Sequence, residues 1–195
     1  MPTGVALRDV RDQLFDAAER VLLRSGPQTL TSRAVTTEAG CAKGVLHRHF
    51  ADFDEFLVEL VRDRAARITQ EGAALVEVAG TGTVTGHVGD ALTSVFQSVA
   101  LAIVGLLTFR DDLRARIRED RPRGLPVLSE ATAMLAGYLA AERDHGRVAA
   151  GADIDMLALT LIGTGHLVFA GRAGAEPDPV ELDGLVTSIV GPSLS

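Results

Sequence analysis

The sequence lacks the features on which most exported proteins depend. Cys41 is its only cysteine, so no disulfide can form within the chain. Residues 1–12 contain charges and no apolar segment of the kind found in a signal peptide. These absences predict a cytoplasmic protein.

Aromatic residues and strand patterns are also scarce. There is no Trp, one Tyr and seven Phe, although 47% of the 195 residues are hydrophobic. No run of alternating polar and apolar residues indicates a β-strand. The prominence of alanine, leucine and valine favours helices, so we predict an all-α fold with an aliphatic core.

One long uncharged segment, residues 91–109, has the length of a membrane span. Polar side chains interrupt it and no basic flank marks an inner side. We interpret it as a central buried helix and expect no membrane partner. The interrupting residues are Thr93, Ser94, Gln97, Ser98 and Thr108.

The net charge of −7 is unusual for a protein that binds nucleic acid, but it is unevenly distributed. Residues 31–50 hold Arg33, Lys43 and Arg48 against Glu38, a net +2, so the remainder carries −9. A basic patch on an acidic protein can still bind phosphate locally. The alternative is an ordinary solvated helix surface.

Residues 31–57 have the order of residue types expected for two short helices that meet at a sharp turn. Thr31 can cap the first helix, which we expect to bury Val35 and Ala39. Gly40 should end it, because a glycine just past a helix end can close the last turn with positive φ. The segment is therefore predicted to be a helix-turn-helix.

The second helix of this motif is expected to begin near Ala42. Helical periodicity places Ala42, Leu46 and Phe50 on its core side, while Gly44 and Arg48 point away. The outward side would be the surface that reads DNA.

These residues also carry a resemblance to a known family. The features are the pair Ala17-Ala18, a Gly-x-x-x-[ST] stretch near Gly26, the segment AGCAKGVLHRHF and the acidic DxxE after it. Together they resemble the N-terminal domain of the TetR family of transcriptional regulators, over about residues 10–60. Four positions depart from the family pattern: Cys41 replaces valine, Ala42 a capping serine, His47 tyrosine and Phe53 a lysine that commonly touches phosphate.

The resemblance implies a three-helix DNA-binding domain, residues 1–51, followed by a larger helical domain for ligand binding and dimerisation, residues 52–195. It implies a homodimer formed through the last two helices, a pseudo-palindromic double-stranded DNA operator and a small-molecule effector. Core packing of these two helices within one subunit is the alternative.

Periodicity and helix breakers predict the remaining helices. The helix at 110–121 is densely charged and ends at Pro122 and Pro126. It is a solvated connector or, by the resemblance, the helix that passes ligand binding to the DNA-binding domain. Gly163 and Gly165 suggest that their helix admits close neighbours. The predicted helices cover residues 8–24, 52–78, 84–108, 110–121, 126–144, 154–171 and 180–190.

We predict distinct roles for the residues of the motif that face DNA. Arg33 is placed to read guanine, as arginine does with two hydrogen bonds in the major groove. Val45 can meet a thymine methyl group, and Gly44 lets the helix lie close. Lys43, His47 and His49 are expected to hold phosphates. The predicted DNA-binding residues are Thr31, Ser32, Arg33, Lys43, Gly44, Val45, His47, Arg48 and His49.

The rest of the chain is longer than dimerisation alone requires, which favours a cavity among its uncharged helices. Few charges lie there, so we expect an apolar or neutral effector. Plain core packing is the alternative for each candidate, and an effector-independent DNA-binding protein is the alternative function. The candidate ligand-binding residues are Phe96, Phe109, Met134, Tyr138 and His166.

Other chemistry finds little support in the sequence. His47 and His49 lie about 200° apart on a helix and cannot chelate one metal together. No nucleophile with a partnered base and no glycine-rich phosphate loop is evident. We therefore expect neither an enzyme nor a cofactor.

Overall fold

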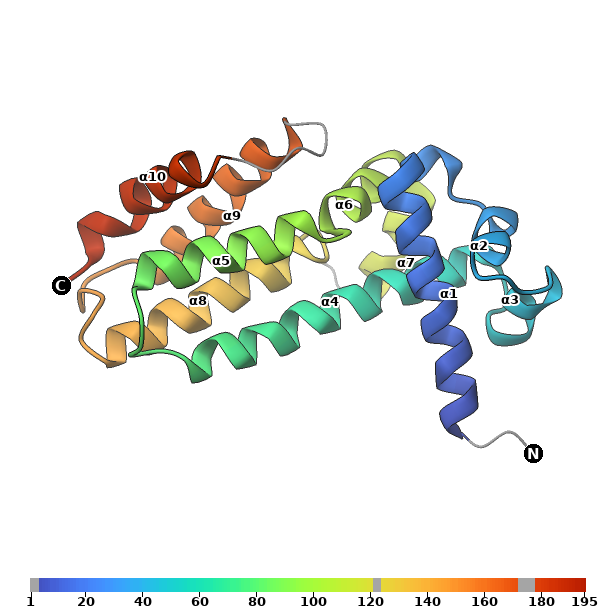
Figure 1. Ribbon diagram of the computed structural model, residues 1–195, viewed down its shortest axis with the longest axis horizontal. Coiled ribbons are helices and arrows are strands. Elements are labelled where there is room, and N and C mark those ends of the chain that lie inside the picture. The colour runs from blue at the N-terminus through green and yellow to red at the C-terminus, as the bar shows by residue number, and fades with distance from the viewer. Residues whose placement is uncertain (1–3, 121–123, 172–177) are drawn as a thin grey trace. The chain divides into compact units, whose positions relative to one another are not determined.

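The computed structural model describes residues 4–120, 124–171 and 178–195 (Figure 1). These residues form helices, with one isolated antiparallel bridge between Val148 and Leu194 and no strand among them. The predicted all-α fold is confirmed. The chain divides into two compact units, the first with the described residues of Met1–Asp63 and Ala102–Arg123, the second with those of Arg64–Leu101 and Gly124–Ser195. The predicted domain boundary at residue 51 remains a prediction.

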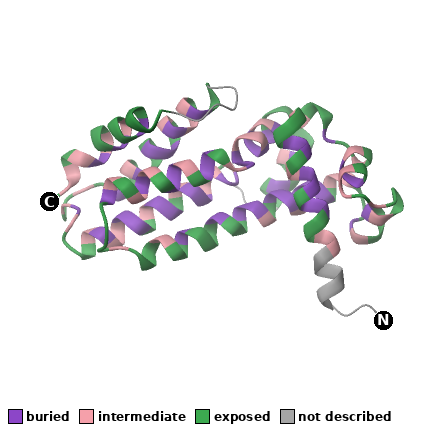
Figure 2. Cartoon of the chain, in the orientation of Figure 1, coloured by how far each residue is buried: buried purple, intermediate pink, exposed green. Residues whose placement is uncertain are grey.

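The first unit has a small core centred on aromatic rings. Phe15, Phe50 and Phe56 lie with their ring centroids 5.0 to 5.8 Å apart. The apolar side of the first helix is buried against this core (Figure 2). The helices of this unit are α1 (Gly4–Ser25), η1 (Pro27–Thr29), α2 (Ser32–Glu38), α3 (Gly44–His49), the start of α4 (Phe53–Glu77), most of α6 (Ala100–Phe109) and α7 (Asp111–Asp120).

The second unit is a bundle of longer helices. Its α8 packs against both α5 and α9, and α10 packs across α5 and α9 (Figure 1). The unit contains the rest of α4, then α5 (Val84–Gln97), α8 (Leu128–Asp144), α9 (Ile154–Ala170), α10 (Pro179–Val190) and η2 (Gly191–Ser193).

Two helices of the second unit begin at aspartate caps. Asp153 accepts a hydrogen bond from the Met156 N–H at 3.1 Å, and Asp178 accepts one from the Val180 N–H at 2.9 Å. Side chains of this kind satisfy N–H groups that have no partner within the helix. The helix predicted to end at residue 144 is α8, and it ends at Asp144 with His145 as its C-cap, followed by Gly146 with φ +74°. Pro122, predicted to end the helix at 110–121, lies outside the described residues.

The single helix predicted over residues 84–108 is wrong, because the chain breaks into α5 and α6. Ser98 has an extended backbone, with ψ −175°, and its Oγ accepts a hydrogen bond from the Ala100 N–H at 3.2 Å. Serine competes with helical bonding in this way when its hydroxyl reaches a nearby backbone group. No single helix among the described residues is long and apolar enough to span a membrane; only the bent pair α5 and α6 together meets the requirements of length and composition.

The two glycines of α9 differ in their surroundings. A Cβ atom on Gly165 would lie 2.7 Å from Cε2 of Phe96, so the close approach predicted there is confirmed. A Cβ atom on Gly163 would meet nothing within 4 Å among the described residues, so a close neighbour for Gly163 stays a prediction.

A buried carboxylate ties three parts of the second unit together. Glu142 is fully buried, and it accepts hydrogen bonds from the Tyr138 hydroxyl at 2.5 Å and the Gly80 N–H at 3.2 Å. Arg147 Nε lies 3.4 Å from its Oε2. Burial, together with the bond to Glu142, raises the pKa of Tyr138, so the phenol stays protonated. His87 Nδ1 lies 2.9 Å from the phenol oxygen.

Candidate nucleic-acid interface

The helices α2 and α3 meet at the sharp turn expected of a helix-turn-helix. Thr31 Oγ1 accepts a hydrogen bond from the Ala34 N–H at 3.1 Å and so caps α2. Gly40 follows α2 with φ +66°, a conformation that costs glycine little. The motif that the sequence predicted is therefore present.

Two details of the motif differ from the prediction. The second helix begins at Gly44 rather than near Ala42, and Ala42 is exposed rather than buried. No side chain caps α3, because Ala42 has no acceptor and Lys43 occupies the cap position. In α2 the buried partner of Val35 is Thr36, whereas Ala39, at the end of the helix, is only half-buried.

The buried side of α3 fixes which side faces outward. Leu46 and Phe50 are buried, as predicted, and Phe50 joins the aromatic cluster of the first unit. Gly44, His47 and Arg48 are exposed on the other side. The helix thus presents a basic surface to solvent.

The residues predicted to contact DNA differ in their exposure to solvent. Ser32 Oγ is buried and has no hydrogen-bond partner among the described residues, so a contact with phosphate would require another rotamer. The Thr31 hydroxyl already serves as the cap of α2. Exposed residues are Thr31, Arg33, Lys43, Gly44, His47 and Arg48, and half-buried ones are Ser32, Val45 and His49.

Sequence reasoning missed Arg11 on α1, which holds α3 in place. Its Nη1 donates to the carbonyl oxygen of His49 at 3.2 Å, and its Nη2 lies 3.3 Å from Oε2 of Glu59. The guanidinium carbon is 4.3 Å from the centroid of the Phe50 ring, within the range of a cation–π contact. A polar residue in an amphipathic helix gives no signal of such partners in a single sequence. Only its spacing of four residues from buried Phe15 hinted at a contact with the core.

Charged side chains connect α7 to the start of α4 within the first unit. Asp52 Oδ1 accepts a hydrogen bond from the Glu55 N–H at 2.6 Å and so caps α4. Arg116 of α7 lies 3.3 Å from the same carboxylate, and Arg110 pairs with Asp54 at 2.7 Å. The Glu55 N–H and the Arg116 guanidinium together lower the pKa of Asp52.

α7 is also anchored by apolar burial. Leu113 and Ile117 are both buried, so this helix is more than a solvated connector. The predicted end of the helix at residue 121 lies outside the described residues.

The candidate ligand-binding residues do not form one cluster. Phe96 stacks on Phe169, with centroids 5.2 Å apart, and its ring centroid is 6.2 Å from that of His166. Tyr138 belongs to the polar network around Glu142. Phe109 lies in the first unit, where its side chain is 71% exposed.

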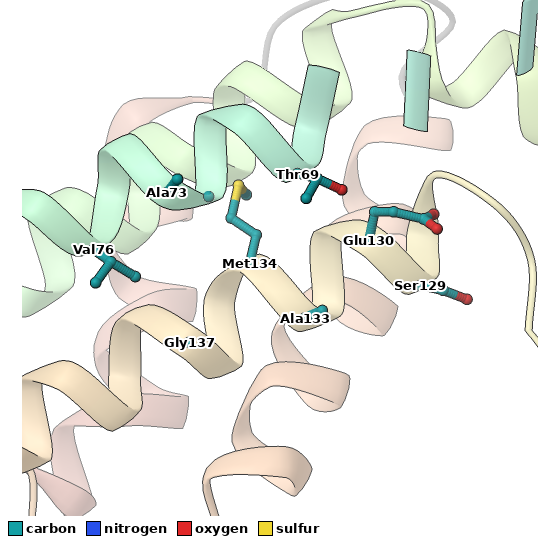
Figure 3. Close-up of a pocket in the computed structure, with 9 residues that line it drawn as sticks. Thr69, Ala73, Val76, Ser129, Glu130, Ala133, Met134 and Gly137 are labelled. Carbon is teal, nitrogen blue, oxygen red and sulfur yellow. The ribbon is translucent and has the colours of Figure 1, made fainter. Parts of the chain in front are cut away.

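Met134, the remaining candidate, lies between two grooves of the second unit. A groove of about 300 Å³ runs between α4 and α8, and Figure 3 shows the Met134 side chain extending toward α4 there. A larger groove of about 410 Å³ runs between α4 and α5. The α4–α5 groove is lined by Glu71, Ala74, Leu75, Val78, His87, Asp90, Ala91, Ser94 and Met134.

Metal-ligating side chains do not gather in the described part of the chain. No three His, Cys, Asp or Glu residues there lie close enough to hold an ion.

Comparison with known proteins supports the motif. Residues 14–60 match the family model described as bacterial regulatory proteins, tetR family. No curated protein matches the sequence of this chain.

Several solved structures are similar over almost their whole length. The *E. coli* NemR structure in its reduced form is 14% identical, with 96% of this chain and 98% of that one covered and a TM-score of 0.70. A TetR-family transcriptional regulator from *Haemophilus influenzae* is 17% identical, with 97% and 99% covered and a TM-score of 0.62. FadR from *Bacillus subtilis*, in complex with stearoyl-CoA, is 19% identical, with 92% and 95% covered and a TM-score of 0.62. At these identities the likeness establishes the fold, a helix-turn-helix domain followed by a larger helical domain.

Proposed function

We propose that this protein is a ligand-responsive transcriptional repressor that binds DNA as a homodimer. The proposal is supported by its N-terminal domain and its overall fold, which are those of the TetR family of transcriptional regulators. The protein binds a pseudo-palindromic operator, and a small apolar or neutral effector releases it.

The observation that carries the proposal is the outward surface of the helix-turn-helix. Arg33, Lys43 and Arg48 are exposed there, on a chain whose total charge is −7. Cations concentrated on one surface bind phosphate, while the acidic remainder discourages binding elsewhere along DNA. Arg33 reads a guanine, and Lys43 holds the phosphate backbone.

The exposed side of α9 supports dimerisation. Met156 and Leu159 are both 56% exposed and Leu167 is 73% exposed, with the open Gly163 between them. These residues follow one another at spacings of three and four, so they form a continuous apolar stripe on one side of the helix. On α10, Val180 is 78% exposed. A homodimer that binds a pseudo-palindrome must place its two α3 helices about 34 to 36 Å apart, one turn of DNA, or a multiple of that distance.

The grooves on either side of Met134 support binding of an effector. Both lie along α4, the helix that begins at the capping residue Asp52 directly after the helix-turn-helix. FadR from *Bacillus subtilis*, which shares the fold, was solved with stearoyl-CoA. An effector that prefers one arrangement of α4 would change DNA affinity only to the extent of that preference, typically about 1–3 kcal/mol.

Sequencing the DNA that the purified protein retains from a random duplex library tests the DNA-binding part. We expect an enriched site with two inverted half-sites about 10 base pairs apart, or a multiple of that spacing. Retention of unselected sequences would contradict the proposal.

One observation favours an effector-independent DNA-binding protein instead. Phe96 and Tyr138, two of the predicted ligand contacts, are only 2% and 0% exposed and fill the core. A protein that keeps its DNA affinity in the presence of every compound that shifts its melting temperature would support this alternative.

A further inference from the structure

We propose that the groove between α4 and α5 takes a small organic cation, an amine with a compact apolar body. The inference rests on the proposed function, because it names the class of the effector. It keeps the apolar body expected from the sequence, but its positive charge departs from the neutral effector expected there.

The groove is built from two helical stripes that face each other. Glu71, Ala74, Leu75 and Val78 line it from α4, and they follow the spacing of one helix face. His87, Asp90, Ala91 and Ser94 line it from α5 with the same spacing. The Ser94 hydroxyl donates to Oε2 of Glu71 at 3.3 Å and so links the two stripes.

The floor of the groove suits an apolar molecule. Ala91 and Met134 are 8% and 6% exposed, and Ala74, Leu75 and Val78 continue the apolar surface along α4. A volume of about 410 Å³ lies within the range of sites for small molecules.

The charges at the groove have a single sign. Glu71 and Asp90 both line it, and no lysine or arginine is among its described lining residues. Both carboxylates are exposed at the rim. An anionic ligand would therefore be repelled, whereas a cation would gain from both carboxylates.

The hydrogen-bonding atoms agree with this charge. The Tyr138 hydroxyl donates to Glu142, so its oxygen accepts from Nδ1 of His87 at 2.9 Å. The Nδ1 proton of His87 is therefore directed to the phenol oxygen and is not offered to a ligand. The Ser94 hydroxyl proton is already directed to Glu71. The side chains of the groove thus offer acceptors and suit a ligand that donates, such as an ammonium group.

Three probes with the same apolar body test the proposal: 1-aminoadamantane, 1-adamantanol and adamantane-1-carboxylate. Binding to the full chain is measured by calorimetry at low and high salt. We expect the amine to bind most tightly, the alcohol more weakly and the carboxylate not at all. The advantage of the amine over the alcohol should shrink as salt screens the rim.

Removing one carboxylate should reduce the affinity for the amine alone. Glu71→Gln and Asp90→Asn should each weaken binding of the amine by about three- to fivefold and leave the alcohol unchanged, because each removes one exposed charge interaction. Glu77→Gln is the matched control, since Glu77 is an exposed carboxylate of the same helix outside the groove. Equal binding of amine and alcohol, no binding of the amine, or equal effects of Glu71→Gln and Glu77→Gln would each overturn the proposal.

DNA release is measured separately, so that the two proposals can fail independently. An amine that binds through Glu71 and Asp90 without altering DNA affinity supports the ligand class and contradicts ligand-responsive regulation. Release of DNA by the alcohol and not by the amine supports regulation and overturns the ligand class.

Discussion

Arg11 donates a hydrogen bond from Nη1 to the carbonyl oxygen of His49 at 3.2 Å. This carbonyl lies in the last turn of α3, where backbone oxygens have no partner within the helix. The same guanidinium lies over the ring of Phe50 and pairs with Glu59 of α4. Arg11 therefore stabilises α3 from the side opposite to its outward surface.

Replacing Arg11 should loosen α3. Arg11→Ala loses a charged hydrogen bond and a cation–π contact, so we expect the free energy of unfolding to fall by about 1–2 kcal/mol. DNA affinity should fall as well, with an unchanged salt dependence, because no phosphate contact is lost. Arg62→Ala is the control, since Arg62 pairs with the same Glu59 at 2.6 Å from the exposed side. If the two variants unfold at the same denaturant concentration, Arg11 has no special part in holding α3.

Arg33 and Lys43 should differ in what their loss does to DNA binding. Arg33→Ala should cost about 1–3 kcal/mol on the operator and relax the preference at one base per half-site. Lys43→Ala should weaken operator and random duplexes alike and reduce the salt dependence by about one phosphate per half-site. Titrations against both kinds of duplex make the comparison. If both variants lost the same affinity for operator and random duplexes, Arg33 would not read a base.

The exposed stripe on α9 predicts the effect of a charge on association. Leu167→Asp places a carboxylate where we propose that a symmetric partner packs, so the dimer should dissociate at micromolar concentration. Sedimentation or light scattering measures the mass. Leu23→Asp is the control, because Leu23 is another exposed leucine, 56% accessible, on α1. A Leu167→Asp protein with the mass of the parent would place the interface elsewhere.

The ion pair between α7 and α4 predicts a pH-dependent stability difference. Asn at position 52 can still cap α4 but cannot pair with Arg116, so Asp52→Asn should unfold more easily than the parent. The folded-state pKa of Asp52 lies below its ordinary 3.8, so its contribution is complete above that value and is lost as pH falls below it. Denaturation curves of the parent and Asp52→Asn should be measured from pH 7 to 3.5. The difference in their free energies of unfolding should be constant near neutral pH and should become smaller toward pH 3.5. Arg116→Gln should remove part of this pH dependence of stability. If the stability difference between the parent and Asp52→Asn stays the same at every pH, the ion pair between Asp52 and Arg116 does not contribute to stability.

The two glycines of α9 should respond oppositely to a methyl group. Gly165→Ala forces the added atom against the buried ring of Phe96, and we expect a loss of about 1–3 kcal/mol. Gly163→Ala adds a methyl group in open space and removes a helix-weakening residue, so it should stabilise the isolated chain by up to about 1 kcal/mol. Both are measured by denaturation at matched protein concentration. Equal effects would mean that Phe96 moves aside freely.

The helix-turn-helix was predictable because its signals are local. A capping residue such as Thr31, a glycine such as Gly40 and buried positions such as Leu46 act within a few residues of the chain. The start of α3 was misplaced for a local reason too, since no capping side chain near Ala42 marked it.

Contacts between segments far apart in the chain could not be predicted from the sequence. Nothing in the sequence around Arg11 indicates that it meets His49, 38 residues away. The surroundings of Phe109 were equally hidden, because an apolar residue in an apolar segment is usually buried, whereas this ring is exposed. The break at Ser98 was missed because a serine within a helix usually bonds back to the preceding turn without ending it.

The Glu142 carboxylate has a consequence for the order in which the second unit folds. Its partners come from Gly80, 62 residues earlier, from Tyr138 on its own helix and from the Arg147 side chain beyond that helix. An intermediate that buries Glu142 before all of them have arrived leaves a charge only partly satisfied, at a cost of several kcal/mol. Such intermediates are therefore sparsely populated, and closure of the turn between α4 and α5 becomes one cooperative step with the docking of α8. The Gly80 amide proton should exchange with solvent more slowly than an unbonded amide in an exposed turn, because its acceptor is buried.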